Sequence, residues 1–328
     1  MSARVWLLLS RRAGDDAQVR ALAAMLGAPA REFLLGHNRL REIPNAWLGA
    51  SLATVKGDPG FGPPWPDLVI GAGRRNAPAA RWIAETSAGQ ARLVWIGRPR
   101  APLSWFSLVL TTPQYGLASA DNVLQMTLPL TAPIGRTAER RFLALLGGPS
   151  WSARVTPAYL RRFAAAADAL AAAADAPLSI ATSPRSPAGA GAALARLLPR
   201  AELHEWRADG DNPYRRWLSE ARGALVSGDS ISLLADAAAT GAPVSILPAP
   251  APAWIRAARA TGPGRRWLSA GGRGFFAPPP NLDALHAALV SRGWARRDGA
   301  LIRLEGAAER MAAERREVAA RLAALSRG

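Results

Sequence analysis

Short apolar runs alternate along the chain with longer stretches rich in Ala, Leu and Arg, and Gly or Pro punctuates the passages between them. This alternation is typical of parallel α/β architecture, in which each buried strand is followed by a helix that covers the sheet. In the first half, the pattern predicts strands at residues 5–9, 68–70, 93–96, 108–110 and 123–126, and helices at residues 17–26 and 77–85.

The second half repeats the alternation. The pattern predicts strands at residues 142–146, 178–181, 201–206, 224–226 and 244–247, and helices at residues 157–174, 189–198, 214–220, 233–240 and 282–292. Pro133 and Gly135 interrupt the pattern, so we expect one domain at residues 1–135 and a second at residues 136–303. Residues 304–328 read as an amphipathic closing helix, which we expect to pack on the protein body rather than dock to a membrane.

Composition narrows the function classes. The 328 residues include no Cys, which excludes disulfides, thiolate metal sites and a cysteine nucleophile. The net charge of +17 favours a polyanionic partner: phosphates, nucleic acid or an anionic membrane surface. The long uncharged runs are broken by Pro, and the apolar run at residues 5–9 is shorter than the core of a signal peptide. We therefore expect a cytoplasmic protein.

Proteins with parallel sheets bind ligands at the carboxyl ends of the strands, so the loops at those ends are the first place to look for site residues. In the first half, two such loops carry candidate residues for a site: Gly14, Asp15, Asp16 and Gln18 after the first strand, and Gly73, Arg74 and Arg75 after the second. The amides and guanidinium groups of the second loop suit a phosphate or another anion. The alternatives are N-capping by one of the aspartates and a tight turn with arginines facing solvent.

The second half offers a similar set of loops, with the candidate residues Gly147, Gly148, Ser150, Ser183, Arg185, Gly228, Asp229, Ser230, Ser232 and Asp236. Paired glycines let another molecule approach the backbone closely, and hydroxyls with helix amides bind a diphosphate. A carboxylate at Asp236, further along that helix, could hold ribose hydroxyls. The alternative is capping by Ser230 or Ser232 ahead of an Ala-rich core helix, which leaves Asp236 unexplained.

Residues 228–243 resemble the nucleotide-sugar pocket of glycosyltransferases with the GT-B fold. Both have a small-residue loop, a helix with an acidic residue, here Asp236, and a Gly-x-Pro before the next strand.

A second resemblance covers nearly the whole chain and points to the family named after the plant mitochondrial-fission "elongated mitochondria" protein. It is carried by residues 14–18, 66–75, 97–100, 122–124, 145–150, 182–187, 212–214 and 228–243. The family pattern has a more polar first loop than Asp15-Asp16-Ala17, and the Arg- and Ala-rich composition looks bacterial. The resemblance implies an α/β fold of two Rossmann-like domains facing a cleft, with a donor nucleotide held by the second domain and an acceptor by the first.

The leading hypothesis is an enzyme: a glycosyltransferase that moves a sugar from a nucleoside-diphosphate sugar to a lipid or cell-envelope glycan acceptor, with no bound metal or other cofactor. The candidate residues of the second half would hold the donor, with Asp236 on the ribose, and those of the first half the acceptor or a phosphate. Asp16 or Asp15 is the expected general base, with His37 as the alternative. His37, His204 and His286 lie too far apart in sequence to suggest metal ligands.

The rival hypothesis is a non-catalytic scaffold that keeps the fold and recruits partners at the inner membrane face. The positive charge and the closing helix suit the scaffold and the enzyme equally. Nucleic-acid binding is disfavoured, because the arginines are spread along the chain and no recognised motif accompanies them.

Overall fold

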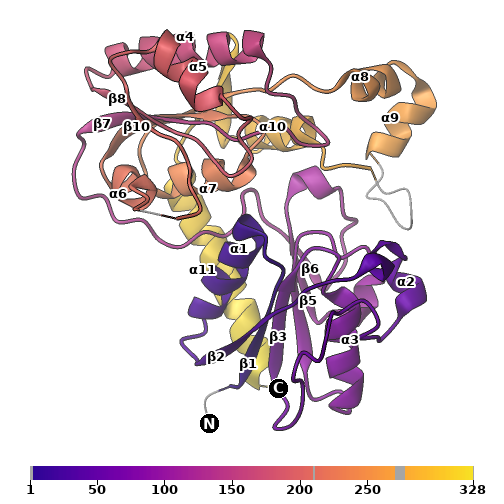
Figure 1. Cartoon of the computed structure of the whole chain (residues 1–328). Helices are drawn as coiled ribbons and strands as arrows, with labels where there is room; N and C mark the ends of the chain where they lie inside the picture. The colour runs from indigo at the N-terminus through magenta and orange to yellow at the C-terminus, as the bar shows by residue number, and fades with distance from the viewer. Residues whose placement is uncertain (1–2, 210, 270–277, 328) are drawn as a thin grey trace. The chain divides into compact units, whose positions relative to one another are not determined.

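A computed structural model describes residues 3–209, 211–269 and 278–327, and the chain divides into two compact units (Figure 1). The first unit is built on Met1–Ala132 and takes in the end of the chain from Ala313 onward. The second is built on Pro133–Leu268 and Pro279–Ala312. The units are therefore not two continuous halves of the chain, because the closing helix begins in the second unit and ends in the first.

The first unit is an open parallel sheet in the strand order β2-β1-β3-β4-β5-β6. Its elements are β1 (Val5–Leu9), α1 (Ala13–Ala24), β2 (Ala30–Leu34), α2 (Asn45–Leu48), β3 (Leu68–Ala72), α3 (Ala77–Thr86), β4 (Arg92–Ile96), β5 (Leu108–Thr111) and β6 (Val123–Gln125), with short 3-10 turns at Arg39–Glu42, Leu103–Trp105 and Pro113–Tyr115.

Strand β1 is buried on both faces, as its unbroken apolar sequence predicts. Leu7 and Leu9 face one cluster, which also contains apolar residues of α1 and the C-terminal helix α11 (Ala307–Arg327). Trp6 and Leu8 face the opposite cluster, which contains the apolar face of α3. Helices thus cover the two faces of the first sheet, and its strand ends remain for loops.

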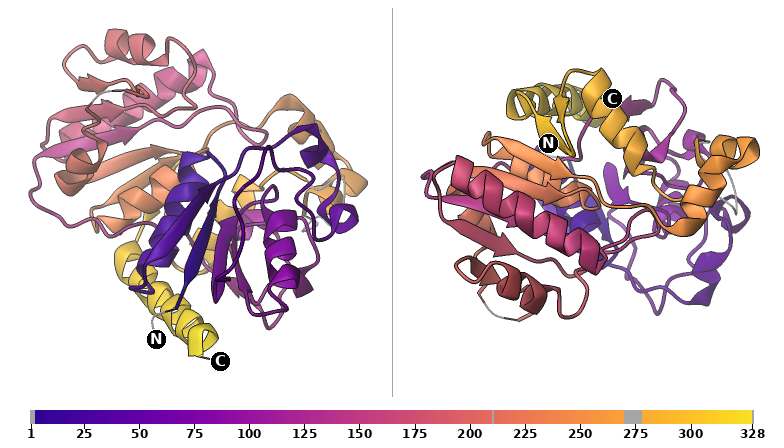
Figure 2. Two further views of the ribbon diagram at one scale, coloured as in Figure 1. Left: turned by 60° about the horizontal axis from the view of Figure 1, so that its bottom comes forward. Right: turned by 90° about the horizontal axis from the view of Figure 1, so that it is seen from above.

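Helix α11, yellow in Figure 2, lies along the first unit, and its apolar residues belong to the core of that unit. Val318 and Leu322 are fully buried against the sheet. The Glu314 carboxylate accepts hydrogen bonds from the amide and the hydroxyl of Thr127, at 3.0 and 2.8 Å. The expectation that the closing helix packs on the body agrees with these contacts, although the helix begins at Ala307 and Leu304 ends a strand.

The second unit has the strand order β12-β13-β11-β10-β7-β8-β9, parallel from β11 to β9, with β13 antiparallel to β11 and to β12. Its elements are β7 (Arg141–Leu145), α4 (Pro157–Ala173), β8 (Leu178–Ala181), α5 (Ala190–Leu197), β9 (Glu202–His204), α6 (Tyr214–Ser219), β10 (Ala221–Ser227), α7 (Ile231–Ala239), β11 (Val244–Leu247), α8 (Ala253–Ala260), α9 (Gly262–Ser269), α10 (Leu282–Ser291), β12 (Ala295–Asp298) and β13 (Leu301–Leu304).

The predicted α/β class is confirmed, and each unit has the architecture of a Rossmann-like domain. Sequence reasoning missed β2, the β12–β13 hairpin, α8 and α9. Strands β2 and β12 lie at sheet edges and are largely exposed, so they lack the apolar run that marks a buried strand. Within the described part of the chain, no helix is both long and apolar enough to cross a membrane.

The packing of α11 on the first unit can be tested by substituting one of its buried residues. Leu322→Ala removes a fully buried side chain from the core and is expected to lower the free energy of unfolding by about 2–5 kcal/mol. Leu40→Ala, at a leucine of the same unit that is 45% exposed, should change stability by no more than about 0.5 kcal/mol. Chemical denaturation of both variants compares the two, and equal effects would contradict the packing of α11.

Candidate functional site

Each sheet has a topological switch point, where consecutive strands diverge and leave a crevice at their carboxyl ends. In the first unit it lies between β1 and β3, because the chain passes from β1 to β2 on one side while β3 lies on the other. In the second unit it lies between β7 and β10, because β8 and β9 extend to the opposite side. Most of the residues predicted from the sequence belong to loops at these two points.

Helix α1 begins earlier than expected, so Gly14, Asp15 and Asp16 form its first turns rather than a loop. The alternative interpretation, N-capping by an aspartate, is wrong, because Arg12 occupies the cap position with no side-chain bond to the helix. Acidic residues in the first turn offset the positive end of the helix dipole without capping it. Gln18 donates from Nε2 to the Gly14 carbonyl at 3.1 Å, within the same helix.

The two aspartates have different surroundings. Asp16 is buried, and its Oδ1 accepts hydrogen bonds from the amide and the hydroxyl of Ser10, at 2.8 and 3.3 Å. The Asp15 side chain is 29% exposed and lies 4.0 Å from the Arg12 guanidinium. Asp16 therefore fixes the turn after β1, whereas Asp15 remains accessible.

Several groups act on the pKa of Asp15. Burial by neighbouring atoms raises the pKa of this carboxyl, the charge of Asp16 adds to the rise, and Arg12 and Arg75 oppose it. Oδ2 of Asp15 lies 3.8 Å from the position that a Cβ on Gly73 would take. The β1 and β3 loops therefore bring Asp15 and Gly73 together, as the sheet topology requires.

The loop after β3 starts two residues later than expected, because the strand ends at Ala72 rather than at Ile70. Gly71 lies within the strand, where a Cβ would come 2.6 Å from the Trp95 ring. Gly73 has φ +68°, and its carbonyl accepts a hydrogen bond from the Trp95 indole at 2.6 Å. Arg74 is ion-paired with Glu42, and its carbonyl is held by the Asn45 side chain at 2.7 Å. Arg74 is therefore anchored on both sides rather than turned to solvent alone.

Arg75 lies in a cationic environment. Its Nε atom is buried without a hydrogen-bond partner. Burial lowers the pKa of Arg75 first, and Arg12, Arg41 and Arg74 lower it further. Burial also lowers the pKa of His37; a hydrogen bond with the Arg75 backbone opposes the fall, and the charges of Arg75 and Arg41 add to it. Positive charge is concentrated at this switch point, which suits an anionic ligand.

Two residues near the first switch point had no assigned role. Burial lowers the pKa of Arg98 to about 10 and raises the pKa of Tyr115 to about 12. The Arg98 guanidinium lies 6.0 Å from the Tyr115 ring and donates to the Pro278 carbonyl. The charge of Asp15 adds to the rise in the pKa of Tyr115. Arg98 lies in the loop after β4 and could have been singled out, but no spacing connects Tyr115 with Asp15.

In the second unit, the paired glycines pack against neighbouring loops of the same unit. A Cβ on Gly147 would lie 2.2 Å from the Asp229 carboxylate, and one on Gly148 would lie 1.7 Å from the Arg185 carbonyl oxygen. The amide of Gly147 donates to the Ser227 hydroxyl at 2.7 Å. Gly228 is likewise close to the backbone of Pro248. These glycines therefore let the loops after β7, β8, β10 and β11 approach one another.

Asp229 holds these loops together from inside. Its side chain is fully buried, and Oδ2 accepts from the Gly148 amide at 2.7 Å and lies 3.5 Å from Nη2 of Arg185. Burial raises the pKa of Asp229, while hydrogen bonding and Arg185 oppose the rise. Asp229 therefore shapes the site rather than facing solvent.

Arg185 and the serines form the more accessible part. The Arg185 side chain is 46% exposed, and Nη1 donates to the Gly148 carbonyl at 3.2 Å. Ser183 accepts through Oγ from the Arg185 amide at 3.3 Å, and Ser150 accepts through Oγ from the amides of Ser152 and Ala153. A guanidinium has five N–H groups, so Arg185 can hold its own loop and still bind an anion.

Helix α7 begins at the β10 loop. Ser230 is its N-cap residue but makes no side-chain cap bond, and Ser232 is exposed, so capping by these serines is not observed. Asp236 lies in the second turn, and its Oδ2 accepts a hydrogen bond from the Tyr214 hydroxyl at 2.9 Å. Burial and the charge of Asp236 raise the pKa of Tyr214. Sequence reasoning gave Tyr214 no role, because strand β10 separates it from Asp236.

The histidines serve different parts of the fold. His204 ends β9 and packs edge-on against Trp217, with ring centroids 6.1 Å apart. His286 is buried on α10, and burial lowers its pKa to about 4. Among the residues that the structure describes, no three His, Asp or Glu side chains gather as metal ligands would.

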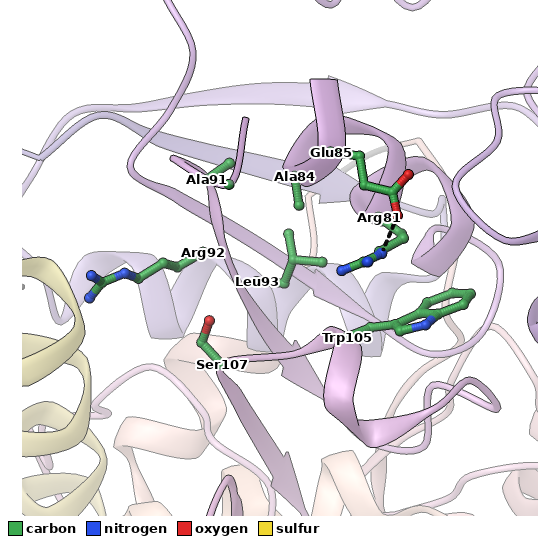
Figure 3. Close-up of a pocket in the computed structure, with 9 residues that line it drawn as sticks. Arg81, Ala84, Glu85, Ala91, Arg92, Leu93, Trp105 and Ser107 are labelled. Carbon is green, nitrogen blue, oxygen red and sulfur yellow. Dashed lines mark ion pairs between the residues drawn. The ribbon is translucent and has the colours of Figure 1, made fainter. Parts of the chain in front are cut away.

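A hollow of about 290 Å³ lies elsewhere, beside α3 and the start of β4 (Figure 3). Arg81 and Glu85 form an ion pair of 2.7 Å on its wall, and the Arg81 guanidinium lies 6.0 Å from the Trp105 ring. Arg92 is the first residue of β4. The hollow is therefore at the amino end of that strand and separate from the switch-point loops.

Comparison with known proteins identifies the family. The model of the family described as Mitochondrial fission ELM1 matches residues 13–262, which include the loops of both switch points. The chain belongs to this family. No protein of curated function matches the sequence of this ELM1-family chain.

Solved structures that resemble this family member have low sequence identity. The Staphylococcus aureus MnaA–UDP structure is 11% identical, with 88% of this chain and 97% of that chain covered and a TM-score of 0.45. AviGT4, a glycosyltransferase involved in avilamycin A biosynthesis, is 16% identical, with coverage of 99% and 97% and a TM-score of 0.43. MurG of Acinetobacter baumannii is 14% identical, with coverage of 71% and 73% and a TM-score of 0.36.

In this ELM1-family chain the Gly148 contact can be tested directly. Gly148→Ala forces the Arg185 backbone away and is expected to lower the free energy of unfolding by at least about 1–3 kcal/mol. Gly135→Ala is the control, because nothing lies within 4 Å of a Cβ at that position. Thermal unfolding of the two variants measures the difference, and an unaltered Gly148→Ala protein would contradict the loop packing described.

Proposed function

We propose that the chain is a GT-B-like glycosyltransferase that moves a sugar from a nucleoside-diphosphate sugar to a lipid or cell-envelope glycan acceptor, without a bound metal. The observation that carries the proposal is the second switch point. There, the N-terminus of α7 lacks a side-chain cap, Arg185 lies at the neighbouring loop, and Tyr214 fixes the Asp236 carboxylate. The family model spans the residues of these loops.

The donor diphosphate is assigned to α7 and Arg185. The first amides of a helix point along its axis and carry partial positive charge, so they bind phosphate oxygens. The exposed guanidinium of Arg185 adds a full positive charge. Together they stabilise the negative charge that develops on the diphosphate as its bond to the sugar breaks, which is the task that a metal performs in other enzymes.

The other donor residues divide into those assigned to ligand oxygens and those that support the loops, and Ser230 of the first group is as buried as Asp229 of the second. The hydroxyls of Ser150, Ser183, Ser230 and Ser232 are assigned to phosphate or sugar oxygens. The buried Asp229 carboxylate, with Gly147, Gly148 and Gly228, supports the loops from behind. Asp236 is assigned to the ribose, because a carboxylate already fixed by Tyr214 loses little freedom when hydroxyls bind to it.

The acceptor is assigned to the first switch point, with Gly14, Gln18, Gly73, Arg74 and Arg75 around it. The positive charge centred on Arg75 suits an acceptor that carries a phosphate. Displacement at the anomeric carbon forms a bond to the acceptor oxygen and breaks the bond to the diphosphate, so the acceptor hydroxyl must lose its proton. Asp15 is the proposed base in preference to Asp16, because it is accessible and its pKa is raised.

Nucleotide binding tests the donor site. We expect one of UDP, GDP, CMP, ADP or TDP to raise the melting temperature without added metal, with about 2.7 kcal/mol of stabilisation at a hundredfold excess over its Kd. Asp236→Ala should abolish this stabilisation. Asp168→Ala, at an exposed carboxylate on α4, should keep it. Absence of binding by all five nucleotides would reject the transferase and favour a scaffold that keeps the fold without the activity.

The pH dependence of sugar transfer tests the base. A base must be deprotonated, so activity should rise with pH through the pKa of Asp15, which burial places above the ordinary value of 3.8. Asp15→Asn should lower kcat by about 10²–10⁴-fold and remove this acidic limb. Asp16→Asn keeps an oxygen acceptor for the Ser10 amide and should retain the limb. The reverse pattern would assign the base to Asp16.

A further inference from the structure

The hollow beside α3 lies where β4 and β5 begin, at the opposite end of these strands from the switch-point loops (Figure 3). Its lining combines an apolar part with polar side chains: Ala84, Ala91, Leu93 and Trp105 on the one hand, and Arg81, Glu85 and Ser107 on the other. The proposed function uses none of these residues. Their combination points to a ligand with both apolar and hydrogen-bonding groups.

Hydrogen bonds fix the backbone around the hollow. Ser87 is buried, and its Oγ donates to the Ala84 carbonyl at 3.0 Å and accepts from the Ala91 amide at 3.1 Å. The Gly89 amide also donates to the Ala84 carbonyl, at 2.8 Å. The end of α3 and the start of β4 are thereby joined through one turn. Because this part of the lining is already ordered, a ligand that binds there loses little affinity to ordering it.

Arg81 and Glu85 offer donors and acceptors with no net charge. Nε of Arg81 lies 2.7 Å from Oε1 of Glu85, and the two side chains are 34% and 52% exposed. A guanidinium has five N–H groups and a carboxylate has about four acceptor positions, so the ion pair leaves most of them for a ligand. Among the described residues, the Ser107 hydroxyl has no hydrogen-bond partner, so it can donate and accept as well.

The Arg92 guanidinium takes little part in this group. Its Nη1 donates to the Leu325 carbonyl of α11 at 2.7 Å, and in Figure 3 the side chain points away from Arg81 and Glu85 toward that helix. The polar side of the hollow is therefore set by the Arg81–Glu85 pair and Ser107, without an excess of positive charge.

Trp105 supplies a flat apolar surface beside the ion pair. The Arg81 guanidinium lies 6.0 Å from the centroid of the Trp105 ring. The indole is half-buried and contacts the buried Phe106, with ring centroids 6.5 Å apart. An indole offers a large, rigid contact area at a low cost in conformational entropy. A ligand in the hollow can therefore contact the aromatic ring and the charged pair at the same time.

The size and charge of the hollow select among ligand classes. Its volume of about 290 Å³ is at the lower end of the roughly 300–1,000 Å³ of small-molecule pockets, which suits one small ring rather than a nucleotide. A phosphate or carboxylate would be repelled by the Glu85 carboxylate. A purely apolar ring would remove Arg81, Glu85 and Ser107 from water without giving them partners.

A sugar ring satisfies each of these requirements. Its hydroxyls both donate and accept, so they can bond to the guanidinium, the carboxylate and the Ser107 hydroxyl together. The C–H groups on one face of a pyranose are apolar and pack against an aromatic ring. No net charge is needed on the ligand, because the ion pair in the hollow is itself neutral.

We propose that the hollow binds a single neutral sugar ring, with the Trp105 indole against its C–H face and Arg81, Glu85 and Ser107 on its hydroxyls. No bond is made or broken there. The site lies away from the loops assigned to the donor and the acceptor, and it requires neither a nucleotide nor catalysis. Its test therefore stands whether or not the chain transfers sugars.

Saturation-transfer difference NMR of the full chain tests the proposal, with D-glucose, N-acetyl-D-glucosamine and D-mannose as separate probes. We expect at least one of them to bind with a Kd of about 1 mM, because a single ring makes few contacts. Glu85→Gln removes a charged acceptor and should weaken binding about tenfold. Glu32→Gln is the matched control, since Glu32 also forms a 2.7 Å ion pair on the surface of the first unit, and it should bind as the unaltered protein does.

The aromatic surface is tested separately. Trp105→Ala should weaken sugar binding about tenfold. If this variant unfolds because the indole is half-buried, the Glu85 variant still decides the outcome, since an exposed ion pair contributes little to stability. Asp236→Ala and Asp15→Asn alter the proposed donor and acceptor sites and should leave binding at the hollow unchanged.

Three results would overturn the proposal. The first is no saturation transfer to any of the three sugars. The second is an equal effect of Glu85→Gln and Glu32→Gln. The third is sugar binding that is lost in Asp236→Ala or Asp15→Asn but kept in Trp105→Ala and Glu85→Gln, which would place the sugar at a switch point. Sugar binding at the hollow without nucleotide binding would instead reject only the transferase.

Discussion

The buried carboxylate of Asp229 is the interaction on which the second switch point depends. It joins the Gly148 amide after β7 to the Arg185 guanidinium after β8, and it lies on the loop that enters α7. A buried charge is costly unless it is paired and hydrogen-bonded, and both conditions are met on Oδ2. The close approach of three loops follows, and it is possible only because Gly147 and Gly148 have no side chains.

At the first switch point, carboxylates anchor the loops and positive charge gathers around Arg75. Asp16 fixes the turn after β1 through Ser10, and the Arg74–Glu42 ion pair anchors the loop after β3. Arg75 remains with a buried, unpartnered Nε among other cations. One unit therefore presents a carboxylate held by tyrosine behind a helix N-terminus, and the other presents concentrated positive charge beside an accessible carboxylate.

The two amphipathic segments of the chain differ in how much of their apolar surface the fold covers. Helix α11 buries its apolar face in the core of the first unit, so packing explains its sequence pattern. Helices α8 and α9 bury Ile255 and Leu268, whereas Trp254 is 39% and Trp267 37% exposed. Periodicity alone does not distinguish these outcomes, because it identifies an apolar face without identifying what covers it.

The positions of the buried strands along the chain could be predicted, because a strand covered on both faces must be apolar along its length. That pattern located β1, β3, β7 and β10, and the rule for parallel sheets then directed attention to the loops that follow them. The pattern did not predict exposed edge strands such as β2, since such strands need no apolar run. It also did not predict where α1 begins, because Asp15 and Asp16 suit a first helical turn as well as a loop.

The sequence by itself therefore determined the class of fold, the strand ends that carry candidate residues and the positive charge of the molecule. Only the tertiary structure decided which of those residues touch. Tyr214 donates a hydrogen bond to Asp236, although strand β10 lies between them in the sequence. Asp229 is buried while Arg185 stays accessible. Asp15 is accessible whereas its neighbour Asp16 is buried. The physical reason is that exposure, pKa and hydrogen bonding depend on packing between segments distant in sequence, whereas the local pattern fixes only which face of each element is apolar.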